Sequence, residues 1–533
     1  MSNSTTGGLA NANALTTTRS KKESDSPFEN VNALAEAAAS DRALTPLQAI
    51  RIYWRAFTWC LFMCMGALLW GYDTQVGGGL LSVPAFRRDF GSEVDGQYIL
   101  AASWQSAFNC VSSIGGMFGG LSLGYISDKL GRRGANTVAC LISLVGILIQ
   151  FFTPVHQNGM LLVGKLVNGY ALGIYLSLAG TYCAEISPLA LRGITTASVN
   201  LWVELGQFMS NGVTRGTGER SDVYAYRLPF ALQLIFPVLL LLGLPFAPES
   251  PWWLVRKGRK EDARRIIARL GGPGVDTNLQ LQQIQETIEL EDSYAHSAHL
   301  IDCFKGTDLR RTMIAIMVFV LQQGSGVVFV IGFSNYFFEL AGFADGNAFN
   351  LGVGVTAIGV VGNLLAFYTV DRFGRRLIFN LGIAGCTVVL FLIGFIWMSP
   401  TQNARWAVAA FTIVYNFIYQ TGIGPLGYVI FAEVPSSRLR SKTVGLGIWS
   451  NSLCQVVVNI AVPYLVNPDE ANLGGYVGFI FGGIAFAGTL WAWYNIPETK
   501  DRTVDELDLL FEQQVPARQF AKQNIHQRYR DEI

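Results

Sequence analysis

Three ionisable side chains lie inside long apolar stretches of this 533-residue chain: Asp73, Lys165 and Glu204. A charge at the centre of a bilayer costs roughly 2.5–3.5 kcal/mol on insertion scales, so a retained charge suggests a function and a partner. Burial favours a neutral carboxyl and a nearby cation favours the ionised one, so a carboxylate that exchanges these environments binds and releases a proton. We expect Asp73 to be a proton site with Lys165 as its counter-charge. The alternative is a static pair that only fixes packing.

Glu204 belongs to a polar stripe with Asn200, Gln207 and Asn211, at spacings of 4, 3 and 4 residues. These spacings place all four side chains on one face of a helix. In a lipid-spanning helix such a face must meet protein or water. Glu204 is therefore a candidate second proton site or hydroxyl ligand, and a structural hydrogen bond to a neighbouring helix is the alternative.

Amide and aromatic side chains form a second group of candidates. A neutral solute rich in hydroxyls needs donors, acceptors and flat apolar faces rather than net charge. The candidate solute ligands are Gln207, Gln322, Gln323, Tyr419, Tyr428, Asn451 and Asn459. For the amides the alternative is hydrogen bonding between membrane helices. Gly422, Gly424 and Pro425 permit a break in the helix that carries the tyrosines.

Charged motifs recur in the loops, which indicates an internal repeat. Asp-x-x-Gly-Arg-Arg occurs at 128–133 and 371–376, Glu with Arg seven residues later at 185 and 433, and Pro-Glu-Ser/Thr at 248–250 and 497–499. Arginine forks match carboxylates bidentately. We expect a latch that favours the state closed to the cytoplasm, and the alternative is that these charges only follow the positive-inside rule. The latch candidates are Asp128, Arg132, Arg133, Glu185, Arg192, Glu249, Asp371, Arg375, Arg376, Glu433, Arg440 and Glu498.

The composition indicates that these residues are positioned by membrane helices. Hydrophobic residues make up 51% and charged residues 14% of the chain, whereas globular domains carry about 25% charge. A spanning helix needs about 20 apolar residues. Twelve runs qualify: 57–80, 98–125, 135–153, 159–184, 194–213, 228–247, 313–338, 351–370, 377–398, 406–432, 443–466 and 475–495. We therefore predict an all-α membrane protein with twelve transmembrane helices in two pseudo-symmetric six-helix bundles.

The repeat and the loops divide the chain into five parts. We predict a disordered cytoplasmic tail and lead-in at 1–55, bundles at 56–254 and 312–500, cytoplasmic linker helices within 255–311, and a cytoplasmic tail at 501–533. Lys and Arg of the short loops fall on one side, so both termini are expected in the cytoplasm, with the plasma membrane as the expected location.

Other classes of function find little support. A net charge of +1 implies no nucleic-acid partner, and seven of the eight Cys lie in apolar segments, so no disulfide framework, metal site or cofactor is expected. No nucleophile–base constellation indicates an enzyme.

Several strings resemble the sugar porter family of the major facilitator superfamily over about 450 residues of the chain. They include GYDT at 71–74, GYISDKLGRR at 124–133, AEISPLALRG at 184–193, QQGSG at 322–326 and PETKDRT at 497–503. The strings PESPWWLVRKGR and SSRLRSKT are most similar to the fungal α-glucoside and hexose permeases. The resemblance implies a membrane carrier that moves a mono- or disaccharide by alternating access, with sugar:proton symport through Asp73.

The resemblance also assigns individual positions. It matches Gln207, Gln322 and Gln323 to sugar-contacting glutamines, and it implies an Arg where this chain has Lys165. Further departures are Val328 in place of an Asn, Tyr428 in place of a common Trp, and Trp70 where α-glucoside permeases are expected to carry an acid. Trp70 therefore counts against an α-glucoside. The alternatives are a facilitative carrier of sugar, polyol or quinate, and a non-transporting sugar sensor, against which the short C-terminal segment argues.

Overall fold

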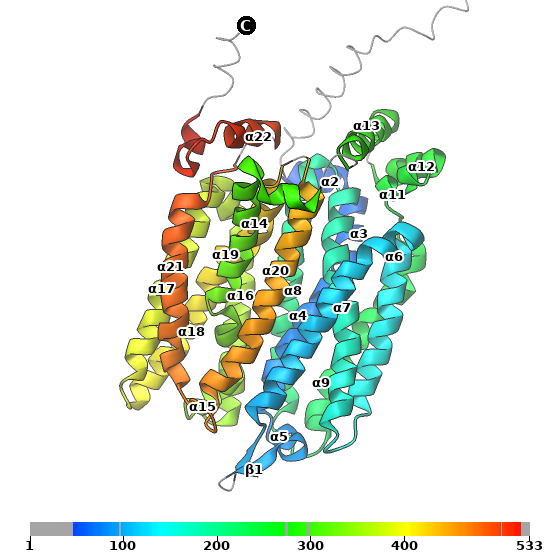
Figure 1. Ribbon diagram of the computed structural model, residues 1–533. Coiled ribbons are helices and arrows are strands. Elements are labelled where there is room, and N and C mark those ends of the chain that lie inside the picture. The colour runs from blue at the N-terminus through cyan, green and yellow to red at the C-terminus, as the bar shows by residue number, and fades with distance from the viewer. Residues whose placement is uncertain are drawn as a thin grey trace, which may run out of the picture.

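The computed structural model describes residues 46–94, 97–271, 276–295, 299–436, 438–500, 502 and 504–523. Two helical bundles stand side by side (Figure 1). The first contains α2 (Pro46–Ile52), α3 (Trp54–Met63), α4 (Met65–Gly79), α6 (Ala102–Phe151), α7 (Asn158–Ile186), α8 (Leu189–Thr217), α9 (Tyr224–Leu232), α10 (Ile235–Gly243) and the 3-10 turn η2 (Leu244–Phe246). The predicted disordered lead-in is thus helical from residue 46, and residues 1–45 lie outside the described part.

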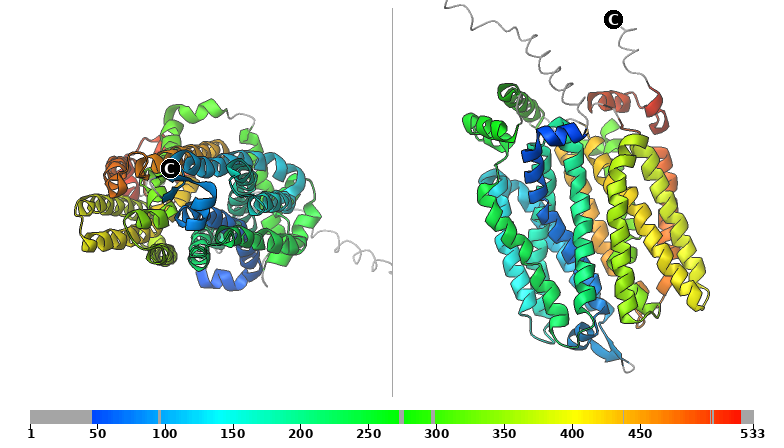
Figure 2. Two further views of the ribbon diagram at one scale, coloured as in Figure 1. Left: turned by 90° about the horizontal axis from the view of Figure 1, so that it is seen from below. Right: turned by 180° about the vertical axis from the view of Figure 1, so that it is seen from behind.

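The second bundle repeats this arrangement. It contains α14 (Gly306–Gly324), the π-helical turn η4 (Val328–Gly332), α15 (Ser334–Leu340), α16 (Asp345–Phe373), α17 (Arg375–Trp397), α18 (Gln402–Thr421), α19 (Ile423–Glu433), α20 (Arg440–Val466), the 3-10 turn η5 (Gly474–Tyr476) and α21 (Val477–Asn495). The bundles meet along α8 with α16 and along α6 with α20, and a view along the helices shows them as two separate groups (Figure 2).

The twelve predicted spans are confirmed, although in the described part only eight helical stretches are long and apolar enough to qualify by length and composition. One of the eight is α6, whose 50 residues hold two spans that meet at Gly131. Three further spans escape the criterion. The first span is split between α3 and α4, the tenth between α18 and α19, and α8 carries the polar stripe of Glu204.

The linker helices α11 (Pro251–Arg256), α12 (Lys260–Leu270), α13 (Thr277–Ala295) and the 3-10 turn η3 (Leu300–Phe304) lie at the same end of the molecule as α22 (Val504–Glu512) and the 3-10 turn η6 (Ala517–Lys522). We call this the linker end. The last segment, predicted as a tail, is partly docked: Leu510, Phe511 and Phe520 are buried, and Arg311 pairs with Asp508 at 2.5 Å.

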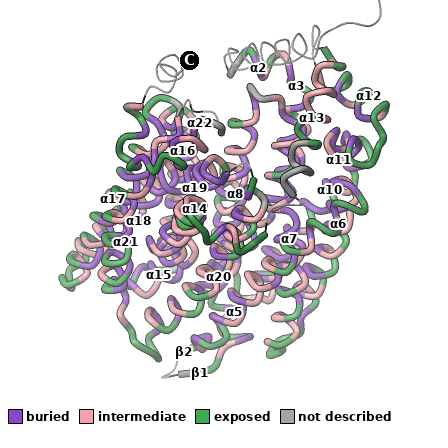
Figure 3. The backbone as a smooth tube through the Cα atoms, turned by 45° about the horizontal axis from the view of Figure 1, so that its top comes forward, coloured by how far each residue is buried: buried purple, intermediate pink, exposed green. Residues whose placement is uncertain are grey.

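The opposite end carries α5 (Pro84–Phe90), the 3-10 turn η1 (Leu80–Ser82) and a hairpin of β1 (Ser92–Val94) and β2 (Gln97–Ile99), in which Glu93 opposes Tyr98. The sequence did not predict this hairpin, because its strands have only three residues each. Buried residues follow the inner faces of the helices (Figure 3), while large apolar side chains such as Leu242 and Leu381 stay exposed. An apolar exterior is what a lipid-facing surface requires.

Candidate functional site

A cavity of about 530 Å³ lies between the two bundles. Its wall runs from the middle of the helices to Asp128 and Arg132 at the linker end. The candidate residues that line it are Asp73, Lys165, Gln207, Gln322, Gln323, Tyr419, Tyr428, Asn451 and Asn459. Tertiary packing thus brings most of the predicted proton and solute residues to one space, with contributions from both halves.

Asp73 is held in the cavity wall by neutral donors. Its side chain is 1% exposed, and its two oxygens accept hydrogen bonds from Ser112 Oγ at 3.2 Å and Asn168 Nδ2 at 3.0 Å. Asn168 is itself oriented by Ser143 Oγ, which donates to Asn168 Oδ1 at 2.8 Å. Asn168 and Ser112 were not predicted from the sequence. The signal for Asn168 was its place three residues after Lys165, on the same face of α7.

Lys165 lines the same cavity but makes no ion pair with Asp73 among the described contacts. Its ammonium lies one turn along α4, beside Gly77: a Cβ built there would be 3.6 Å from Lys165 Nζ and 2.7 Å from Asn109 Oδ1. The predicted Asp73–Lys165 pair is therefore open in this conformation.

The predicted solute ligands form an amide-lined wall. Gln322 Nε2 donates to Gly424 O at 3.1 Å, and Gln323 Nε2 donates to Asn451 Oδ1 at 2.9 Å. The Oε1 atoms of Gln207 and Gln323 are buried without a hydrogen-bond partner in the described residues. Buried acceptors without donors are costly, so this wall is suited to a ligand that donates hydrogen bonds.

Aromatic rings complete the wall. Tyr419 stacks on Tyr415 with 6.1 Å between ring centroids, and Tyr428 meets Phe319 edge to face at 5.5 Å. Trp70 and Val328, two positions that depart from the resemblance, also line the cavity. Flat apolar faces beside amide groups suit a sugar ring, which has both apolar C–H faces and hydroxyl edges.

Glu204 does not line the cavity directly. It is fully buried, and its oxygens accept hydrogen bonds from Asn416 Nδ2 at 3.2 Å and from Gln420 Nε2, both on α18 of the other half. Asn459, by contrast, reaches back to the first half and donates to Ser113 Oγ at 3.2 Å. Polar side chains thus join the two halves along both interfaces.

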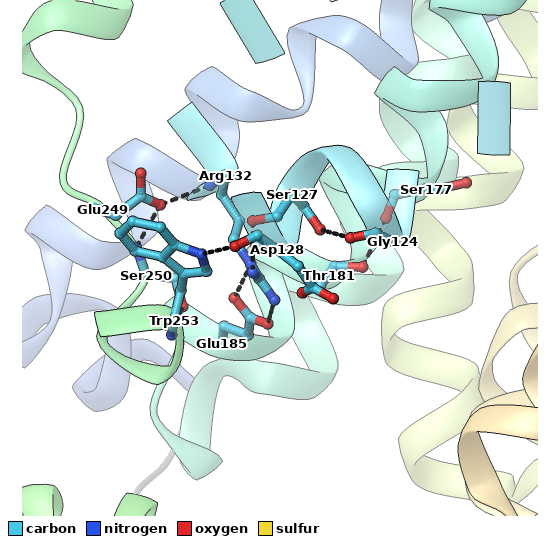
Figure 4. Close-up of polar contacts among 10 residues, drawn as sticks. All are labelled: Gly124, Ser127, Asp128, Arg132, Ser177, Thr181, Glu185, Glu249, Ser250 and Trp253. Carbon is cyan, nitrogen blue, oxygen red and sulfur yellow. Dashed lines mark hydrogen bonds and ion pairs between the residues drawn. The ribbon is translucent and has the colours of Figure 1, made fainter. Parts of the chain in front are cut away.

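The charged loop motifs form a closed network at the linker end (Figure 4). Arg132 donates to Glu185 through Nη2 at 2.6 Å and Nε at 2.8 Å, and Glu249 accepts from the backbone N–H groups of Arg132 and Arg133 at 2.8 and 3.3 Å. Arg133 donates from its side chain to Leu244 O and Pro245 O. Asp128 is exposed, and its backbone oxygen accepts from the Trp253 indole at 3.1 Å.

The second half repeats this network. Arg375 pairs with Glu433 at 3.3 Å, and Glu498 accepts from the backbone N–H groups of Arg375 and Arg376 at 2.9 and 3.2 Å. All of these bonds lie within one half. Among the described contacts, none of the ion pairs given for these motifs joins the two halves, and the side chain of Asp371 lies outside the described residues. The latch between the halves stays a prediction.

The structure corrects the partners of two predicted latch carboxylates. Glu185 and Glu433 were expected to reach Arg192 and Arg440, but they pair with Arg132 and Arg375. Ser187, in an extended conformation, ends α7 before α8 begins at Leu189, and Arg192 lies in the first turn of α8. Arg192 instead lines a pocket of about 390 Å³ beneath the linker helices, and Arg440 donates to Ala432 O at 3.1 Å.

Contacts between the halves close the opposite end. Arg87 of α5 pairs with Glu339 of α15 at 2.5 Å, with side chains 18% and 16% exposed. Asn467, fully buried, accepts from Gln105 Nε2 at 2.9 Å and from the Tyr336 hydroxyl at 2.8 Å. None of these residues was predicted as part of the site. The two pairs that cross between the halves, Arg87–Glu339 and Gln105–Asn467, join segments more than two hundred residues apart, whereas Tyr336 and Asn467 both belong to the second half. The lining of the cavity, in contrast, reaches the linker end at Asp128 and Arg132.

Comparisons with known proteins agree with this geometry. Residues 59–511 match the family model described as sugar (and other) transporter. The chain is 35% identical over 524 residues to the general alpha-glucoside permease of Saccharomyces cerevisiae, covering 95% of this chain and 84% of the relative. It is 34% identical to maltose permease MAL31 of the same organism, with 92% and 81% covered.

Solved structures show the same fold. The proton:xylose symporter XylE bound to 6-bromo-6-deoxy-D-glucose is similar with a TM-score of 0.71 and 23% identity, over 86% of this chain and 99% of that one. The partially occluded inward open conformation of XylE from E. coli has a TM-score of 0.70, 22% identity, and coverage of 84% and 99%. Members of the matched family are transporters rather than enzymes. This chain belongs to the sugar (and other) transporter family of the major facilitator superfamily.

Proposed function

We propose that the protein moves a neutral mono- or disaccharide together with a proton by alternating access between the bundles of 56–254 and 312–500. The observation that carries this proposal is Asp73: a buried carboxyl in the cavity wall, bonded to Ser112 and Asn168, with Lys165 in the same cavity but unpaired with it. A proton carrier needs a carboxyl whose surroundings change during the cycle. Approach of the Lys165 ammonium would stabilise the ionised form and release the proton.

The solute site consists of Gln207, Gln322, Gln323 and Asn451 with the tyrosines Tyr419 and Tyr428. The unpartnered amide oxygens of Gln207 and Gln323 support a ligand that donates hydroxyl hydrogens. The relatives are named as alpha-glucoside and maltose permeases, which favours a glucoside. Trp70 in the cavity wall favours a smaller sugar, so a panel with both sizes is required.

The linker end is the cytoplasmic end in this proposal, and the membrane is the plasma membrane. The short loops at that end carry Lys129, Arg132, Arg372 and Arg438, which fits the positive-inside rule. The conformation is then inward-facing, because the cavity extends to the linker end and the Arg87–Glu339 pair closes the other. In the opposite state the charged loops of the two halves would meet and act as the cytoplasmic latch.

A facilitative carrier of sugar, polyol or quinate is the second candidate, favoured by the absence of an Asp73–Lys165 ion pair among the described contacts. Uptake of radiolabelled glucose, xylose, maltose and trehalose into cells, with and without a protonophore, separates the two. The symporter accumulates one of these sugars, and the protonophore abolishes the accumulation. Asp73→Asn mimics the protonated carboxyl and should retain sugar counterflow without accumulation. Protonophore-sensitive accumulation in Asp73→Asn would exclude Asp73 as the proton site.

A further inference from the structure

Glu204 is held by the other half of the molecule. It lies on α8, yet both of its oxygens accept hydrogen bonds from α18, through Asn416 Nδ2 and Gln420 Nε2. A glycine on α16 makes room for it, because a Cβ at Gly359 would lie 2.0 Å from Glu204 Oε1. No cation pairs with Glu204 among the described residues. Three helices of two halves therefore converge on one buried carboxyl.

The main consequence of this contact falls on Gln420, which lines the solute cavity. Gln420 donates to Glu204 and accepts at Oε1 from Asn200 Nδ2 at 3.1 Å and from Asn363 Nδ2 at 3.4 Å. Both oxygens of Glu204 accept hydrogen bonds in this arrangement, whereas an amide donates at one end and accepts at the other. Glu204 therefore decides which way the Gln420 amide points, and the two asparagines follow.

Gln420 also stands next to a break in the helix. Tyr419, which precedes it, lines the cavity, and Gly422 leaves the helical conformation with φ −117° and ψ −85°. The hydrogen bonds of Glu204 thus hold the last turn of α18, immediately before α19 begins at Ile423. The first half therefore holds the end of α18, a part of the second half that lines the cavity.

We infer that Glu204 is a positioning residue that orients Gln420 and the end of α18 for solute binding, through hydrogen bonds that cross between the halves. Glu204 itself does not touch the solute. This inference rests on the proposed function only in taking the cavity as the solute path. It assigns Glu204 no role in carrying the proton, which belongs to Asp73.

The test uses two single variants and their combination. Glu204→Gln presents an N–H to the N–H of Gln420 and should raise the KM for sugar counterflow about tenfold, at unchanged maximal rate per inserted protein. Gln420→Glu places two carboxyl groups against each other and should raise the KM further than Glu204→Gln does. The double variant restores every donor and acceptor: the new amide at 204 donates to the new carboxylate at 420, which also accepts from Asn200 and Asn363. Its KM should return to within twofold of the parent.

A matched control and a solute-free readout complete the experiment. Glu261→Gln makes the same chemical change at an exposed position of α12 and should leave the KM unchanged. Hydrogen exchange of residues 416–424 should rise in Glu204→Gln and fall back in the double variant, and this measurement stays informative if none of the sugars tested is transported. Counterflow needs no proton gradient, so a failure of proton coupling does not affect it.

Two results would overturn the inference. One is a double variant no better than Gln420→Glu in both KM and hydrogen exchange. The other is a Glu204→Gln protein with parental KM that has lost accumulation and kept counterflow, because that behaviour identifies a proton site. Misfolding of a variant is measured separately by gel filtration of the detergent-solubilised protein. Rescue in the double variant shows that the raised KM comes from a displaced Gln420 side chain and not from misfolding.

Discussion

Arg87 and Glu339 join the two halves of the molecule at 2.5 Å, at the end opposite the linker. A second crossing at this end joins Gln105 of the first half to Asn467 of the second, and Tyr336 of the second half donates to the same Asn467 oxygen. For the charged motifs at the linker end, which are richer in arginine, the ion pairs Arg132–Glu185 and Arg375–Glu433 of the described residues each lie within one half. The contacts that close this conformation are therefore at the end where the sequence shows the fewest charges.

Removal of the Arg87 guanidinium should open that end. Arg87→Gln removes the guanidinium that pairs with Glu339, and the loss of a pair near the surface costs on the order of 1 kcal/mol, a factor of roughly five. Labelling of a cysteine introduced at Val327 in the cavity, with a membrane-impermeant reagent added on the hairpin side, should increase by that factor. Arg220→Gln is the control, because its pair with Asp222 is exposed and lies within one loop. Equal labelling in both variants would refute a gating role.

The glycine of each loop motif should be irreplaceable. Gly131 and Gly374 have φ of 78° and 89°, and a Cβ at either would lie 2.5 Å from the carboxylate of Glu249 or Glu498. A positive φ combined with ψ of 178° at Gly131 and 165° at Gly374 is essentially restricted to glycine, and such a conformation costs another residue on the order of 1–3 kcal/mol. Gly131→Ala and Gly374→Ala should each lower the melting temperature in detergent. Gly180→Ala, on α7 with open space around it, should not; similar melting temperatures for all three would contradict the motif geometry.

The amides of the cavity should control sugar affinity. Gln322→Ala and Gln323→Ala each remove one or two hydrogen bonds of about 1 kcal/mol, so the KM for uptake should rise five- to tenfold without loss of membrane insertion. Asn451→Ala should resemble Gln323→Ala, because Asn451 orients that glutamine. Parental kinetics in all three variants would place the solute elsewhere.

The docked C-terminal segment should depend on Arg311. Its guanidinium pairs with Asp508 and lies 4.4 Å from the centre of the Phe511 ring, and the side chain is 4% exposed. Arg311→Met keeps the apolar stem but removes the charge. Limited proteolysis should then cut within 504–523 faster than in the parent. Arg518→Met, which removes a guanidinium over Trp493 and Tyr494 at the other end of the segment, tests whether release is local, and unchanged cleavage in Arg311→Met would show that apolar packing alone holds α22.

The sequence alone determined the architecture and the chemical inventory. Apolar runs of about 20 residues have one stable solution in a bilayer, since every backbone polar group must be paired internally. The repeated loop motifs revealed two halves, and the scarcity of charge in the spans singled out Asp73, Lys165 and Glu204. These inferences depend on composition and spacing along the chain, which folding does not change.

Only the tertiary structure decided which groups meet. Glu185 pairs with Arg132 rather than Arg192, and Asp73 accepts a hydrogen bond from Asn168 rather than pairing with Lys165. Glu204 accepts hydrogen bonds from α18 of the other half. Helix packing fixes such choices, because it sets the rotation and height of each helix against partners far away in the sequence. The pairing of Arg87 with Glu339 could not be predicted from the sequence for the same reason. A transporter adopts more than one conformation, and the sequence pattern is the same in each, so it does not show which contacts are formed in this one.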